Sequence, residues 1–227
     1  MTLDLETLVL RAGIHSSAVD GVSLMEAVSV VAGEPWSNSP RCTSPVIATY
    51  ARGLNDWLSD IERQSLKAYI PRLIGTAKPN LELERAFICA DTAVRVFARL
   101  ALAAAGIGVE AAKLGALAPV DRESSELARS AASVAELAAR SAVSRSEWSL
   151  TESMRSAAES ARSAALSVAS AGRSAAASSA SAAESTARLS VRSAASAEAA
   201  ARLAGKAAEP VRSAAFELLD RLIAAGS

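Results

Sequence analysis

The stretch ESMRSAAESARSAALSVASAGRSAAASSASAAESTARLSVRSAASAEAAARLAGKAAE, residues 152–209, decides the fold class of this chain. Most of its residues are Ala or Ser, and Ala has the highest intrinsic helix propensity because it loses no side-chain entropy in a helix. The scarcity of large apolar side chains would also fit a disordered segment. However, glycine occurs there only at Gly172 and Gly205, and no proline lies between Pro119 and Pro210. The stretch is therefore predicted to be helical.

The charged residues of this region are regularly spaced, which supports the helical prediction. Eleven residues make three turns at about 3.67 residues per turn, so side chains at that spacing form a nearly straight stripe. The stripe consists of Arg129, Arg140, Arg162, Arg173, Glu184 and Lys206, with Thr151 and Ala195 at the two remaining positions. Glu152, Arg155 and Glu159 alternate in charge at the spacing of helix-surface ion pairs. One uninterrupted helix would be about 130 Å long, so a break is predicted at residues 144–151.

Large apolar residues are too sparse in this region for the leucine seam of a coiled coil. Small residues let helix backbones approach closely, so burial is expected to come from Ala and Ser. Such burial gives little stabilisation per residue in water, and the helices are expected to need partners. We predict that they pack on another helix of this chain, or that they mediate self-association or binding to a protein partner.

Composition argues against several other classes of protein. The formal net charge is zero, so no excess of basic residues points to nucleic acid or to an acidic membrane. The beginning of the sequence has no basic region followed by an apolar run, which predicts no signal peptide. Residues 92–109 are the most apolar, but Arg95 and Arg99 interrupt them and the segment is short for a bilayer. A cytoplasmic location without a membrane or nucleic-acid partner is expected.

Residues 1–120 contain start and stop signals for several helices and no segment with period-two alternation, so we predict an all-α fold. Ser23 with Glu26 and Ser59 with Glu62 have capping-box spacing, and Ser44 before Pro45 is typical of a helix start. Helices are expected over residues 3–11, 24–32, 45–58, 60–68, 81–105 (capped by Asn80) and 109–117. We predict three regions: a helical module at 1–120, long Ala/Ser-rich helices at 121–209, and an amphipathic helix at 210–227 that packs back on the bundle.

Several motifs resemble a family of bacterial and phage proteins in which a module of this kind precedes an Ala-rich helical region. They are GVSLMEAV at residues 21–28, AGEPWS at 32–37, PRCTSPV at 40–46, Asn55-Asp56, and PRLIGT at 71–76. The segment 210–227 is also similar to the end of those proteins, so the resemblance covers essentially the whole chain. It implies this architecture and no particular activity.

The same resemblance bears on a metal site. Members of the family have Ser-Asp-His-Pro-x-Cys where this chain has SNSPRC at residues 37–42, and often Cys at the position of Ser23. A His/Cys cluster of that kind suggests a metal site in those relatives. This chain keeps only His15 and Cys42, which are too few ligands for a closed zinc site. No metal and no cofactor are therefore predicted.

Polar residues of the first module support two interpretations. If the helices pack as a hairpin, these residues could converge into a pocket that binds a small ligand or catalyses a reaction. Alternatively, they cap helices and fix loops through buried hydrogen bonds. Cys42 precedes a helix start that could lower its thiol pKa, but a small buried hydrophobic role is more frequent. The candidate ligand-binding residues are Glu26, Glu34, Trp36, Cys42, Asn55, Asp56 and Arg72.

No catalytic residue is assigned, since no Ser or Cys is visibly paired with a base and an orienting acid. The sequence favours a non-enzymatic helical structural or interaction protein that uses its Ala/Ser-rich helices as a packing arm. The alternative is a small-ligand-binding or catalytic module around the candidate residues above.

Overall fold

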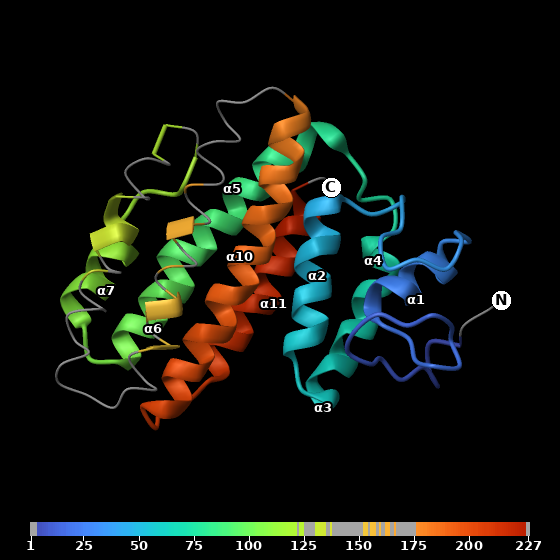
Figure 1. Ribbon diagram of the computed structural model, residues 1–227, viewed down its shortest axis with the longest axis horizontal. Helices are drawn as coiled ribbons and strands as arrows, with labels where there is room; N and C mark the ends of the chain where they lie inside the picture. The colour runs from blue at the N-terminus through green and yellow to red at the C-terminus, as the bar shows by residue number, and fades with distance from the viewer. Residues whose placement is uncertain are drawn as a thin grey trace.

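The computed structural model describes residues 4–121 and 176–225 and, between them, residues 123–124, 130–134, 137, 152–153, 155–157, 159, 162–163 and 166. All regular secondary structure in these residues is helical (Figure 1), which confirms the all-α prediction. None of the described helices has the length and apolarity of a membrane span. The predicted break at residues 144–151 lies outside the described residues.

The first half of the chain contains short helices, and the first three of them begin directly after a predicted capping residue, Ser23, Ser44 or Ser59. They are α1 (Leu24–Val31), α2 (Pro45–Trp57), α3 (Asp60–Arg63), the 3₁₀ helix η1 (Gln64–Tyr69) and α4 (Ile70–Leu73). The Ser44 hydroxyl accepts a hydrogen bond from the Ile47 N–H at 3.2 Å, as an N-cap does. The helix expected over residues 60–68 begins where predicted but continues as a 3₁₀ helix from Gln64.

A continuous helical run follows, and it is less regular than the single α-helix predicted over residues 81–105. It consists of the 3₁₀ turn η2 (Pro79–Leu81), α5 (Glu82–Thr92), the π-helical segment η3 (Ala93–Ala98) and α6 (Arg99–Ala104). Asn80 lies inside η2 and does not cap the run, because the 3₁₀ turn already begins at Pro79. A glycine at positive φ, Gly106, then reverses the chain into α7 (Gly108–Gly115).

The second half of the Ala/Ser-rich stretch forms α10 (Ala176–Leu203), which lies at the centre of the bundle. It packs against α2, α5, η3, α6 and α11, and Figure 1 shows it between α5 and α2. Its buried face consists mainly of small residues: Ala183, Thr186, Ala187, Ser190, Val191, Ser193, Ala194, Ala197, Ala200 and Ala201. Where α10 crosses α2, a Cβ on Gly53 would lie only 2.9 Å from Val191 Cγ1. Small residues thus bring the two backbones close together, as predicted.

The last helix, α11 (Glu209–Ala224), packs on α10, α2 and α5. The buried Tyr50 hydroxyl donates to the Ala215 carbonyl at 2.9 Å. Leu218, Leu219 and Leu222 belong to the same apolar core as residues from α1, α2 and α5. Residues of α1, α2 and α5 therefore share one core with α10 and α11, and residues of η3, α6 and α7 form a second, smaller cluster.

A buried ion pair connects three of these helices. The Arg85 guanidinium is fully buried and lies 2.8 Å from Glu82 Oε1. The other Glu82 oxygen accepts hydrogen bonds from the Ser44 hydroxyl at 2.7 Å and from the Val46 N–H at 3.2 Å, so this carboxylate caps the start of α2. Arg85 also donates to the Leu222 carbonyl at 3.2 Å, near the end of α11.

The helix expected over residues 3–11 is not formed among residues 4–11, and that prediction is wrong. A turn at residues 5–7 is followed by chain without regular secondary structure. The Arg11 N–H donates to the Val22 carbonyl at 2.9 Å, as between neighbouring strands. Long-range hydrogen bonds from the rest of the protein replace the hydrogen bonds that a helix would make.

Candidate functional site

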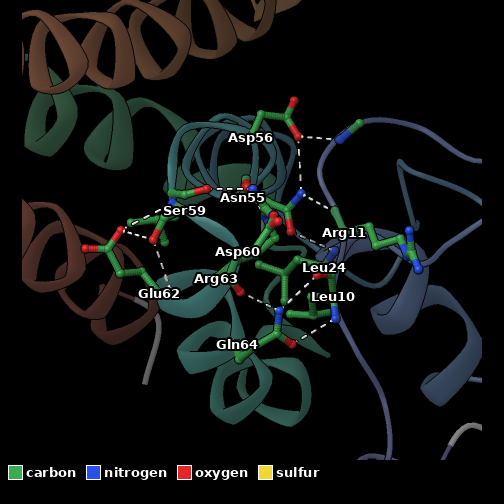
Figure 2. Close-up of polar contacts among 12 residues, drawn as sticks. Leu10, Arg11, Leu24, Asn55, Asp56, Ser59, Asp60, Glu62, Arg63 and Gln64 are labelled. Atoms are coloured by element: carbon green, nitrogen blue, oxygen red, sulfur yellow. Dashed lines mark hydrogen bonds and ion pairs between the residues drawn. The ribbon is translucent and has the colours of Figure 1, made fainter.

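Residues 8–13, called the leading segment below, lie against the end of α2 and η1, and the side chains of these two elements that contact the segment are called the cleft. Residues 8–11 have no regular secondary structure, and residues 12 and 13 form a bend. The side-chain amide of Gln64 pairs with both polar groups of one residue of this segment. Its Oε1 accepts from the Leu10 N–H at 2.9 Å, and its Nε2 donates to the Leu10 carbonyl at 3.0 Å (Figure 2). Gln64 therefore satisfies the Leu10 backbone in the way that an adjacent β-strand would.

Three more side chains of the cleft bind main-chain atoms of the leading segment. Asn55 Nδ2 donates to the Arg11 carbonyl at 2.9 Å. Asp56 Oδ1 accepts from the Gly13 N–H at 2.8 Å, and Lys67 Nζ donates to the Leu8 carbonyl at 2.9 Å. The cleft thus binds this segment mainly through its backbone.

A buried arginine holds together the two elements that form the cleft. Arg63 donates from Nε to the Asn55 carbonyl and from Nη2 to the Leu58 carbonyl, both at 2.6 Å. These carbonyls lie at the end of α2 and have no partner further along that helix. Because Gln64 follows Arg63 directly, the arginine fixes the position of Gln64 relative to Asn55 (Figure 2).

Side chains of the leading segment alternate between the protein interior and solvent. Leu8 and Leu10 are buried, whereas Val9 is 62% exposed and Arg11 is also exposed. A groove of about 870 Å³ runs along the segment, and its lining includes Val9 and Ile61, which is 87% exposed. Alternation of this kind is what an extended strand with one buried face shows.

A second polar cluster lies beside the first one and involves two of the predicted site residues. Glu26, which is fully buried, accepts hydrogen bonds from the His15 N–H at 2.7 Å, from His15 Nδ1 at 2.9 Å and from the Ser23 N–H at 2.8 Å. Burial opposes ionisation of Glu26, but these hydrogen bonds outweigh it and lower its pKa. Trp36 Nε1 donates to the His15 carbonyl at 2.9 Å. Glu26 and Trp36 together fix the loop around His15.

Glu34 and Cys42 form a third local arrangement, in the loop before α2. Glu34 Oε2 accepts from the Arg41 N–H at 2.7 Å, and this hydrogen bond is the main cause of the lowered pKa of Glu34. Burial raises the pKa of the Cys42 thiol, the opposite of an activated nucleophile. The Cys42 carbonyl accepts from the N–H of Gly75 at 2.9 Å, so the loop is tied to the end of α4.

Arg72 lies away from the other candidates. Its guanidinium pairs with Asp220 on α11 at 2.8 Å and lies 4.8 Å from the centre of the Tyr69 ring. The structure therefore does not bring all seven candidate residues into one pocket. The cavity that touches Asn55 and Asp56 has a volume of only about 10 Å³, room for about one water molecule.

The polar groups of these clusters bond chiefly to main-chain atoms. Among the residues that the structure describes, no group of three or more His, Cys, Asp or Glu side chains is arranged to hold a metal ion. The arrangement fits capping and loop fixation. An open groove lies along the leading segment.

Sequence reasoning missed Gln64, Lys67 and Arg63, three residues that build the cleft. A helix over residues 60–68 was expected, and on a helix surface these side chains look like ordinary solvated groups. The one signal in the sequence is the short apolar run of Leu8, Val9 and Leu10, which is too short to identify a strand.

Comparison of this chain with protein-family models, with curated proteins and with solved structures found no match. The resemblance to the bacterial and phage family with an Ala-rich region therefore stays a prediction.

Proposed function

We propose that this chain is a non-enzymatic helical structural and interaction protein that associates with further copies of itself. The observation that carries this proposal is the use of its polar side chains, among them the buried Glu26 and Asn55 and the exposed Asp56. Glu26, Asn55 and Asp56 each accept or donate hydrogen bonds to main-chain groups at distances between 2.7 and 3.3 Å. Side chains used in this way organise a fold, and they leave little capacity for a substrate.

The Ala/Ser-rich helix contributes packing rather than chemistry. Over residues 183–201, its small-residue face is covered by helices of the same chain. The exposed side of α10 carries Arg188, Arg192 and Arg202 and is suited to solvent. We therefore assign self-association to the surface around the leading segment, where Val9 and Ile61 line an open groove.

Sedimentation velocity over a wide range of protein concentration tests this proposal. A dimer fraction that increases with concentration is expected, with the helical content unchanged in circular dichroism. A monomer at every concentration would contradict self-association.

The alternative function, a small-ligand or catalytic site around Glu34 and Asp56, is tested by replacing both residues in one variant. If Glu34→Gln with Asp56→Asn only lowers the melting temperature, the two carboxylates have a structural role. Thermal shift against a metabolite collection provides the second readout. A compound that stabilises the native protein but not the folded double variant would favour the ligand site.

A further inference from the structure

We propose that the cleft side chains Asn55, Gln64 and Lys67 form a binding site for an extended peptide backbone, and that two copies of this chain associate by exchanging their leading segments. Each copy would then hold residues 8–12 of the other copy. This inference deepens the proposed self-association and rests on it.

The contacts of the cleft are the first argument. Gln64, Asn55 and Lys67 bind the backbone of residues 8, 10 and 11. Among the side chains of the segment, those of Leu8 and Leu10 are buried by the rest of the protein. Recognition of this kind resembles the addition of a strand, in which backbone hydrogen bonds give affinity and alternate side chains give specificity. A second copy presents the same segment and can make the same contacts.

The hinge that the exchange requires is present at Gly13 and Ile14. Gly13 has φ of 90°, a conformation that a glycine adopts at little cost. Ile14 is 77% exposed, so its side chain is little buried. The next residue, His15, is held by Glu26 and Trp36. The leading segment can therefore rotate out while the chain from His15 onward stays in place.

Exchange conserves the contacts that opening breaks. The bond from the Arg11 N–H to the Val22 carbonyl and the four side-chain hydrogen bonds made by Gln64, Asn55 and Lys67 are lost in the open chain and formed again with the second copy. For this reason, domain swapping is a low-cost route to a dimer. With a hinge of two residues, which span about 7 Å at most, the two clefts must lie close together. The exposed apolar side chains beside each cleft, Val9 and Ile61, would then be covered by the other copy.

Complementation in trans tests the peptide-binding site. In the full chain, Leu10→Asp places a charge at a fully buried position, so the leading segment should leave the cleft. A labelled peptide of residues 4–13, DLETLVLRAG, is then titrated with this variant and followed by fluorescence anisotropy. Saturable binding is expected, with at least about tenfold weaker binding when Gln64→Ala is added, because two hydrogen bonds are lost.

The matched control is Val9→Asp, which places the same charge one residue away on the exposed side. This variant should keep its own segment bound and should bind the peptide at least about tenfold more weakly than Leu10→Asp, because an attached segment has a high effective concentration. Equal peptide binding by both variants, or no binding by a folded Leu10→Asp variant, would overturn the proposed site.

Amide hydrogen exchange of the unaltered protein keeps the proposal testable if Leu10→Asp does not fold. The N–H groups of Leu10 and Gly13 should exchange faster than those in the middle of α2, because the segment opens without global unfolding. Equal protection of both sets would show that the segment cannot leave the folded protein, and the exchange mechanism would be wrong.

Sedimentation velocity then separates this inference from the broader proposal. An excess of the free peptide, or the Leu10→Asp change, should convert the dimers into monomers. Dimers that persist under both conditions would overturn segment exchange and leave self-association standing. A protein that is monomeric at all concentrations would overturn both.

Discussion

The close approach of α2 and α10 gives the sharpest prediction for stability. At the crossing point, a Cβ on Gly53 would lie between 2.9 and 3.1 Å from three carbon atoms of the Val191 side chain. Optimal carbon–carbon contacts are about 3.5–4.0 Å. Gly53→Ala must therefore push the two helices apart or force Val191 into a strained position.

The size of the effect follows from two opposing contributions. Overpacking a filled core costs about 1–3 kcal/mol. Replacing a glycine with alanine inside a helix contributes about 1 kcal/mol in the other direction. Gly53→Ala is therefore expected to lower the free energy of unfolding by up to about 2 kcal/mol. In a Val191→Ala background the contacts to Cγ1 and Cγ2 are removed and only the contact to Cβ, at 3.1 Å, remains, so the same change should destabilise the protein less, or at most stabilise it by about 1 kcal/mol.

Urea denaturation followed by circular dichroism measures the four free energies of this double-mutant cycle. Gly108→Ala is the matched control, since no atom lies within 4 Å of the added Cβ and the residue begins α7. It should be neutral or slightly stabilising. If Gly53→Ala has the same effect as Gly108→Ala, and its effect does not depend on residue 191, the close packing of α2 against α10 is refuted.

Three further predictions concern buried charges and thiols. Glu82→Ala should lower the free energy of unfolding by about 3–5 kcal/mol, because the buried Arg85 guanidinium loses its carboxylate partner. Urea denaturation measures this change, and a loss below about 1 kcal/mol, which is typical of a surface ion pair, would contradict the prediction. The pKa of Glu26 is lowered from 4.5, so its ionised form stabilises the folded protein above about pH 4.5, and this contribution is lost as the pH falls through the lower folded pKa. Glu26→Gln should thus reduce stability at neutral pH and make the stability depend less on pH in the acid range. Melting temperatures measured between pH 7 and pH 3 test this, and the same fall in melting temperature toward pH 3 in both proteins would exclude the stabilising role of ionised Glu26. Cys42 is partly exposed and Cys89 is buried, so a thiol reagent should modify only Cys42 in the native protein and both thiols in denaturant. The reaction of Cys42 should be slow, because burial raises the pKa of its thiol. Rapid modification of Cys89 in the native protein would mean that the core opens.

Local signals in the sequence predicted several elements correctly. Ser44 before Pro45 marked the start of α2, and the Ser59–Glu62 spacing marked the start of α3. Such signals are reliable because capping satisfies backbone N–H groups within three residues of the cap, and no distant partner is needed. The role of Ala and Ser in close packing was also readable, since a residue without a large side chain cannot prevent two helices from approaching.

The candidate site was predictable only in part. Glu26 and Asn55 were identified as polar residues with a structural alternative, and the structure shows which main-chain groups each of them binds. Arg72 was grouped with them by sequence, but its partner, Asp220, lies 148 positions further along the chain. No local pattern carries information about a contact at that separation.

The amino-acid sequence by itself determined the helical class and the starts of α2 and α3. These depend on propensity and on hydrogen bonds between neighbours in the chain. Only the tertiary structure decided that α10 finds its partners within this chain, and that residues 8–11 are extended instead of helical. The second outcome depends on Gln64 and Lys67, whose hydrogen bonds to the leading segment exist only after η1 has folded against it.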